Sequence, residues 1–239
     1  MTRVAACGRD DCSVPQPAGA VLRRLRTYAL PSETLLRRGH QFAHPDPATL
    51  VPGIGNTRFA PLEGTRHVYV AATTFAAMLE SAFHDAAPPA PRIPLAVLAQ
   101  WAEAEVALRR GVRLIDLRDP ELDRLGIDRS ALVATAAAHY PCTRVWARAL
   151  HGRRVGGHDT HGLVWHSRQA ELHARAMQNR PALRELIDTH PAEVAVLWAP
   201  PAPDELLRAT GQGLGRLDQG EGDRYVTDLV ALLGIVSQD

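Results

Sequence analysis

The sequence predicts an α+β fold, a single domain in which a mixed β-sheet core is surrounded by helices. Segments with the apolar composition of strands follow segments of helical periodicity in irregular order, whereas a doubly wound parallel sheet would need regular alternation. The chain has 239 residues and no internal repeat, which suits one large domain or two small ones. We expect residues 1–14 to be a flexible N-terminus and residues 15–239 to form the domain.

The first half of the chain predicts a helix and a strand, then a proline-rich loop, a second strand and a second helix. Residues 22–30 have helical character, and residues 33–40 form the first strand. Residues 68–72 are apolar and β-branched, which is typical of a buried strand. Thr73 and Thr74 are candidate N-caps for the helix that follows.

The second half of the chain predicts shorter elements. Residues 95–110 fit a helix or a strand, and we favour a helix for their first half. The other elements that we expect are strands at 112–117, 162–165 and 194–198, and helices at 120–125, 130–138, 142–150 and 225–235.

The composition excludes several classes of protein. The formal net charge is +1 at pH 7, so no strong field draws the chain to nucleic acid or to a membrane surface. The chain contains no lysine, which excludes a Walker-type phosphate loop and a pyridoxal Schiff base. Arginine still binds phosphate well, because its planar guanidinium can form two parallel hydrogen bonds with an oxyanion.

We expect the protein to lie in the cytoplasm. The N-terminal residues lack the apolar core of a signal peptide, and no apolar run approaches the length of a membrane span. The three cysteines do not form a disulfide framework. An H-D-x-H pattern starts at His158 beside two glycines, and we interpret it as a loop rather than a metal site.

The segment from Arg58 to Glu80 carries the most informative residues. An arginine, a tyrosine in an apolar strand (Tyr69) and a carboxylate on the following helix all lie within it. A second strand-like run, GLVWHS, ends on the hydroxyl of Ser167. A site that binds an anionic dinucleotide and stabilises a cationic sugar in the transition state needs these residue types. Ser167 also stands where it can cap the helical segment after it.

The chain resembles the RES-domain family over about residues 35–198. This family, the toxin half of RES–Xre toxin–antitoxin pairs, is named for an arginine, a glutamate and a serine. The blocks that carry the resemblance occur in the family's order: LLRRGH, NTRFAP, HVYVAATTFAAMLESAFH, RLIDLRDPELDRLGI, YPCTRVWARAL and GLVWHSR. By this resemblance Arg37 stands in the first arginine position, and Arg38 stands where some members have an aromatic residue.

The resemblance implies an ADP-ribosyltransferase-like fold that binds NAD as its substrate. Arg37 and Arg58, with Arg38 beside them, are then the candidates for binding the pyrophosphate of NAD, because a pyrophosphate needs positive charge in bidentate geometry. Tyr69 is the candidate for stacking on nicotinamide or shaping its pocket.

The resemblance also implies which residues act on the bond between nicotinamide and ribose. As nicotinamide leaves, the ribose gains positive charge, and a carboxylate near the ribose stabilises that charge. Glu80 is the candidate for this carboxylate. Ser167 is the candidate for a hydroxyl that bonds phosphate or ribose, and no Gly-x-Ser-x-Gly elbow marks it as a nucleophile.

The implied function is that of a toxin that consumes NAD, by phosphorolysis or hydrolysis, and so arrests growth. Two alternatives stay open: an ADP-ribosyltransferase that modifies a protein, and a RES-like binding module without activity. We expect no resident cofactor and no metal, with NAD as substrate and inorganic phosphate as a second substrate if the reaction is phosphorolysis. An Xre-type antitoxin is the expected partner, and the oligomeric state, a homo-oligomer included, stays open.

Overall fold

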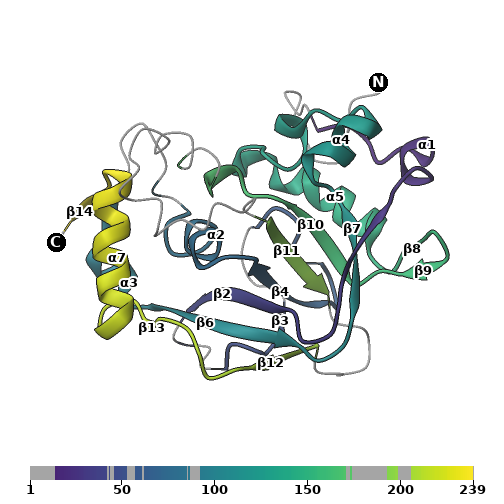
Figure 1. Cartoon of the computed structure of the whole chain (residues 1–239). Coiled ribbons are helices and arrows are strands. Elements are labelled where there is room, and N and C mark those ends of the chain that lie inside the picture. The colour runs from purple at the N-terminus through teal and green to yellow at the C-terminus, as the bar shows by residue number, and fades with distance from the viewer. Residues whose placement is uncertain are drawn as a thin grey trace.

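Figure 1 shows a computed structural model of the whole chain. The structure describes residues 14–41, 43, 46–52, 57–60, 62–84, 86, 92–170, 173, 193–198 and 206–238. Within these ranges a mixed sheet of ten strands forms the core, and helices cover one side of it (Figure 1). The predicted α+β class is confirmed.

The helices and strands have the following bounds. The helices are α1 (Gly19–Leu22), α2 (Thr74–Leu79), α3 (Leu95–Leu98), α4 (Asp119–Leu125), α5 (Tyr140–Leu150) and α7 (Gly220–Leu233). The strands of the first half are β1 (Thr27–Leu30), β2 (Leu35–Gln41), β3 (Val51–Pro52), β4 (Arg66–Ala71), β5 (Arg92–Pro94), β6 (Trp101–Leu108) and β7 (Val112–Asp116). The later strands are β8 (Arg154–Val155), β9 (His158–Asp159), β10 (Gly162–His166), β11 (Glu193–Trp198), β12 (Leu207–Ala209), β13 (Gly215–Arg216) and β14 (Val236–Gln238).

The main sheet places β10 in its interior. The strand order is β1–β7–β10–β11–β4–β2–β6–β12, with β3 paired to β4 and β13 paired to β6. β10 runs parallel to β7 and antiparallel to β11. Because β10 is bonded on both sides, the sheet fixes the backbone as far as His166, the residue directly before Ser167.

Two apolar cores lie on the two faces of the sheet. The larger core packs α2, α4, α5 and α7 against one face and contains Met78, Trp146 and Trp165. The second core lies on the other face and contains Val70 and Val106. In Figure 1 α2 lies over β2 and β4, and α7 lies at the far end of the sheet, where it contacts β13. The helices of the larger core thus pack on the face of the sheet on which Trp165 lies.

The short helix α2 begins with a side-chain cap and is held by burial. The Thr73 hydroxyl accepts a hydrogen bond from the backbone N–H of Ala76 at 3.1 Å, as predicted for an N-cap. Every residue from Phe75 to Leu79 is buried. The helix ends at Leu79, and Glu80 is its C-cap, with φ −91° and ψ 3°. Burial of the helix therefore fixes where the Glu80 side chain starts.

The helix expected at 22–30 is wrong: only Leu22, the last residue of α1, is helical there, and Thr27–Leu30 forms β1, which pairs with β7. Residues 95–110, expected as helix or strand with a helix favoured in their first half, contain both: α3 covers Leu95–Leu98, and Trp101–Leu108 forms β6. Pairing of β6 with β2 along seven residues outweighs the helix propensity of its alanines and glutamates.

Two further predictions also need correction. The helix expected at 130–138 is replaced by two short 3-10 turns, Arg129–Ala131 and Ala137–His139. Cys142 is disulfide-bonded, and the expectation of no disulfide framework did not anticipate this bond.

Two absences hold for the described part of the chain. No helix there is long and apolar enough to cross a membrane. No group of three or more histidine, cysteine, aspartate or glutamate side chains gathers there as a metal site would require.

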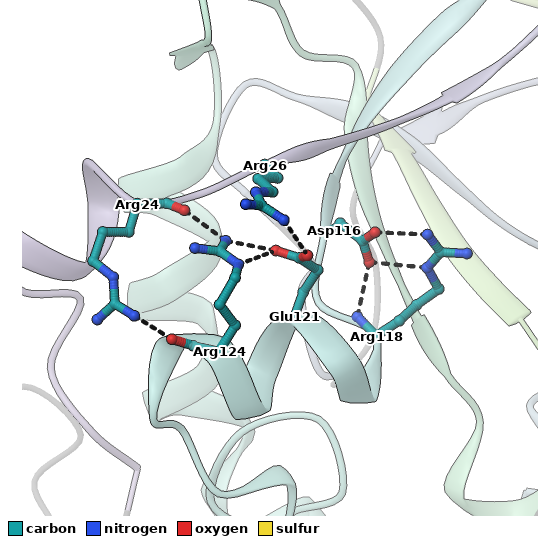
Figure 2. A network of polar contacts seen from close by, with 6 residues as sticks. All are labelled: Arg24, Arg26, Asp116, Arg118, Glu121 and Arg124. Atoms are coloured by element: carbon teal, nitrogen blue, oxygen red, sulfur yellow. Dashed lines mark hydrogen bonds and ion pairs between the residues drawn. The ribbon is translucent and has the colours of Figure 1, made fainter.

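A polar network ties the segment before β1 to α4 (Figure 2). Arg124 Nη2 donates to the Arg24 carbonyl at 2.6 Å, and Arg24 donates to the Arg124 carbonyl in return. The Glu121 carboxylate bonds Arg124 at 2.5 Å and lies 3.4 Å from Arg26. An exposed ion pair contributes at most about 1 kcal/mol, so the network adds to the strand pairing of β1 without replacing it.

Gly39 sets the distance between β2 and the end of α2. A Cβ at Gly39 would lie 2.0 Å from Ser81 Oγ and 2.7 Å from Ser81 Cβ. We expect Gly39→Ala to displace the end of α2 and to lower the free energy of unfolding by about 1–3 kcal/mol, as overpacking does. Urea denaturation measures this loss.

A second substitution tests whether the clash is the cause. Ser81→Gly removes the atoms that a Cβ at Gly39 would meet, so the double variant should lose less than the sum of the two single losses. Strictly additive losses would show that Gly39 matters for another reason.

Candidate active site

A hydrogen bond joins Glu80 to Ser167 across 87 residues of sequence. Ser167 Oγ donates to Glu80 Oε1 at 2.5 Å, and it accepts from the backbone N–H of Ala170 at 3.1 Å. Ser167 is fully buried, and Glu80 is partly exposed. Ser167 thus caps the helical turn after it and also holds the carboxylate at the end of α2, so the two interpretations of this residue are compatible.

Glu80 keeps one carboxylate oxygen available. Its Oε1 accepts from Ser167, and within the described residues no hydrogen bond or ion pair engages Oε2. A carboxylate held by one oxygen and open at the other has a fixed direction and can still interact with a substrate.

Arg58 is a largely buried cation held by neutral groups. Its Nη1 donates to the carbonyl of Thr135 at 3.1 Å and to the hydroxyl of the same residue at 2.5 Å, with the Leu132 carbonyl at 3.5 Å. Its guanidinium carbon lies 4.9 Å from the centre of the Tyr140 ring. No carboxylate of the described residues forms an ion pair with it. Because a buried cation without a counter-ion is costly, Arg58 is suited to receive an anion.

The charge of Arg58 also faces Glu80. Burial lowers the pKa of the Arg58 guanidinium, while Tyr140 and then Glu80 act in the opposite direction. Of the three arginines selected from the sequence, Arg58 therefore interacts with Glu80, which bonds Ser167, and these three residues lie on the helix-covered side of the sheet.

Tyr69 holds the segment that carries Arg58. Its hydroxyl lies 2.9 Å from the hydroxyl of Thr57 and accepts from the backbone N–H of Phe59 at 3.1 Å. The ring packs edge to face against Trp165, at 6.1 Å between centroids. Burial raises the pKa of Tyr69 to about 12, so the hydroxyl is neutral at ordinary pH. Stacking of Tyr69 on nicotinamide stays a prediction.

Arg37 and Arg38 lie on opposite faces of β2, as neighbouring strand residues must: Arg37 shares the helix-covered face with Gly39, and Arg38 shares the other face with Leu36. Arg37 pairs with Glu105 at 3.0 Å and with the buried Glu103 at 3.7 Å. Burial lowers the pKa of Arg38 to about 10. In the described part of the chain, neither arginine forms a hydrogen bond or an ion pair with Glu80, Ser167 or Arg58. A role for either in binding NAD stays a prediction.

Backbone carbonyls hold Arg38, and no carboxylate of the described residues forms an ion pair with it. It donates to the Thr49 carbonyl at 2.9 Å and also to the Pro47 carbonyl. Asp46 lies close enough to act against the lowering of the Arg38 pKa. These contacts fasten the loop before β3 to β2.

Several residues of the cluster were not singled out from the sequence. The ring of Tyr140 lies against the Arg58 guanidinium in a cation–π contact, and the Tyr140 hydroxyl lies 3.2 Å from His84 Nε2. Arg168 donates to the Ala134 carbonyl at 3.3 Å. Tyr140 and His84 lie in blocks that carry the family resemblance, and that is the one signal that could have indicated them.

An apolar hollow of about 160 Å³ lies on the other face of the sheet. Its lining includes Leu36, Val70 and Val164, which belong to the second core. None of the predicted site residues lines it. A dinucleotide site needs converging charged and polar groups, so we place the candidate site at Glu80 and Ser167 instead.

Comparisons with known proteins identify the family of the chain. Residues 34–208 match the model of the family described as RES domain, and this range includes every predicted site residue. The crystal structure of the M. tuberculosis MbcT–MbcA toxin–antitoxin complex contains a similar chain, with a TM-score of 0.52 and 12% sequence identity over 87% of this chain and 93% of that chain. At that identity the likeness shows the fold alone. No curated protein matches the sequence.

The Tyr69 hydroxyl should stabilise the fold in a pH-dependent way. Tyr69→Phe leaves the Phe59 N–H without its acceptor, so we expect a loss of about 1–3 kcal/mol in the free energy of unfolding at pH 8. Because the folded pKa is about 12 and the unfolded value is 10.0, the stabilisation is fully present below pH 10 and is lost as the pH rises toward 12. Urea denaturation at several pH values measures the difference.

Tyr225→Phe is the matched control. The Tyr225 hydroxyl is buried and has no hydrogen-bond partner within the described residues, so its removal should cost little or nothing. Equal losses in the two variants would contradict the assigned role of the Tyr69 hydroxyl.

Proposed function

The chain belongs to the RES domain family, and from that premise we propose that it is a toxin that cleaves the bond between nicotinamide and ribose in NAD. The observation that carries the proposal is the hydrogen bond of 2.5 Å that fixes Glu80 against Ser167, together with the half-buried Arg58, which forms no ion pair with a carboxylate of the described residues. A directed carboxylate and an available cation are the two charges that this substrate requires.

The reaction breaks the bond between C1′ of the ribose and the ring nitrogen of nicotinamide. The electron pair of that bond leaves with nicotinamide, whose ring nitrogen becomes neutral, and positive charge develops on the ribose. Glu80 Oε2 faces this charge in our proposal. Ser167 keeps Glu80 in position, so little reorganisation is needed at the moment of reaction.

The pyrophosphate of NAD would bind at Arg58. Its Nη1 is engaged by Thr135 and Leu132, which leaves the rest of the guanidinium to bond an oxyanion. Arg37 is a weaker candidate in its present state, because two carboxylates already neutralise it. Arg37 or Arg38 would join the binding of NAD only by exchanging its present partners for the substrate.

The acceptor of the ADP-ribosyl group distinguishes the variants of this proposal. Inorganic phosphate would give phosphorolysis, water would give hydrolysis, and a protein nucleophile would give ADP-ribosylation of a target. A binding module without activity would not need the fixed pair of Glu80 and Ser167, and this favours an enzyme.

A partner protein is part of the proposal. The similar solved chain belongs to a toxin–antitoxin complex. We propose that an antitoxin of Xre type covers the site of this chain and holds its activity off, and that both act in the cytoplasm.

Release of nicotinamide from NAD tests the function. We expect the purified protein to release nicotinamide, and Glu80→Gln to reduce kcat about a hundredfold, because the amide keeps the shape and loses the charge. Assays with and without inorganic phosphate separate phosphorolysis from hydrolysis, and transfer of label from NAD to protein detects the third acceptor.

Glu121→Gln provides the control for that assay. Glu121 is a carboxylate bonded by Arg124 on α4, and it takes no part in the candidate site. Turnover of Glu80→Gln close to that of Glu121→Gln would remove Glu80 from the mechanism. Absence of nicotinamide release and of label transfer in the wild-type protein would refute the enzyme proposal.

Arg58→Ala should mainly weaken NAD binding. Its removal takes away a charge-assisted contact, and such contacts contribute about 1.5–3 kcal/mol, so the KM for NAD should rise at least about tenfold. Calorimetric titration of NAD into Glu80→Gln and into the double variant with Arg58→Ala measures binding without turnover. Unchanged affinity would assign Arg58 to the scaffold.

A further inference from the structure

A polar network holds the peptide that precedes Ser167. Arg129 Nη2 donates to the carbonyl of His166 at 2.9 Å, and Arg129 Nη1 donates to Asp119 Oδ2 at 3.1 Å. His166 Nδ1 lies 3.3 Å from the same carboxylate oxygen. Three elements, namely α4, the 3-10 turn at Arg129 and the end of β10, therefore meet directly beside the serine that bonds Glu80.

From this geometry we infer that Arg129 is a positioning residue, which fixes Ser167 so that its hydroxyl points at Glu80. The inference rests on the proposed function for its meaning in catalysis, but the geometry that it describes exists without a substrate. Arg129 bonds neither Glu80 nor Ser167, and it acts through the peptide between His166 and Ser167.

The chemistry of the guanidinium suits this role. A planar guanidinium offers donors in fixed directions, so it can bond a carbonyl and a carboxylate at once and hold a fixed angle between them. Its side chain is 21% exposed, and that of Asp119 is 36% exposed. At this depth the ion pair is screened by water, so its main contribution is geometry rather than stability.

The loop that begins at Arg129 also reaches the other half of the site. Leu132 and Thr135 supply the carbonyls that hold Arg58, and Ala134 supplies the carbonyl that holds Arg168. One short loop thus contacts both the serine side and the cation side of the candidate site. The contacts of Arg129 at the start of this loop would therefore help to keep Ser167 and Arg58 at a fixed position relative to each other.

Kinetics of Arg129→Met test the inference. We expect kcat for nicotinamide release to fall roughly tenfold to a hundredfold, because a small displacement of an active-site group has that effect. KM should change less than kcat, because Arg129 bonds the peptide before Ser167 directly and reaches Arg58 only through the loop that carries Leu132 and Thr135. Arg129→Lys should recover part of the loss, since an ammonium group can bond one of the two acceptors in good geometry.

Arg124→Met is the matched control. Arg124 also donates to one carbonyl and one carboxylate, at Arg24 and Glu121, and it lies outside the candidate site (Figure 2). Both variants lose one carbonyl contact and one carboxylate contact, so a loss of stability from such contacts would affect both. A fall in kcat in both variants alike would reduce Arg129 to a scaffold residue.

Hydrogen exchange supplies a readout that needs no activity. The Ala170 N–H donates to Ser167 Oγ, so its exchange rate reports how firmly the serine is held. We expect faster exchange at Ala170 in Arg129→Met than in Arg124→Met. Equal rates in the two variants would overturn the inference, whether or not the wild-type protein cleaves NAD.

A milder variant keeps the test decisive if Arg129→Met does not fold. Asp119→Asn keeps the side-chain shape and removes the charge that Arg129 bonds, so exchange at Ala170 should rise less than in Arg129→Met but more than in Arg124→Met. Exchange at Ala170 that stays at the wild-type rate in both Asp119→Asn and Arg129→Lys would also overturn the inference.

Discussion

The hydrogen bond between Ser167 and Glu80 is the contact on which the candidate site depends. It joins the end of an interior strand to the end of a buried helix, and neither end can move without disturbing the core. Ser167 is fully buried and its hydroxyl serves two partners, the Glu80 carboxylate and the Ala170 N–H. A buried hydroxyl that lost these partners would cost about 1–3 kcal/mol, so the fold itself favours the arrangement that the chemistry needs.

The predicted site arginines differ in whether their partners are charged or neutral. Arg37 is neutralised by Glu103 and Glu105, whereas Arg58 is held by carbonyls, a hydroxyl and the ring of Tyr140. A cation whose partners are neutral keeps its charge for a ligand, while one between two carboxylates does not. The chain has no lysine, so its anion-binding cation must be one of its many arginines. The neutral partners of Arg58 make it the arginine best suited to an anionic substrate.

The fold class and much of the candidate site could be predicted from the sequence. The strand at 68–72, the cap at Thr73 and the helix after it follow from local composition, and they bring Glu80 to a helix end. Ser167 follows a strand for the same reason. The helix expected at 22–30 failed because Thr27–Leu30 gains backbone hydrogen bonds from β7, and no local propensity reports such a partner.

The sequence by itself determined the residue types, their order and the elements that carry them, because capping, periodicity and composition are local properties. Only the tertiary structure decided which side chains meet. It brought Glu80 and Ser167 into contact across 87 residues, gave Arg37 and Arg38 separate surroundings, and placed Arg129 behind Ser167. Such contacts arise from the order of the strands in the sheet and from packing between distant segments. Neither can be predicted from the spacing of residues along the chain.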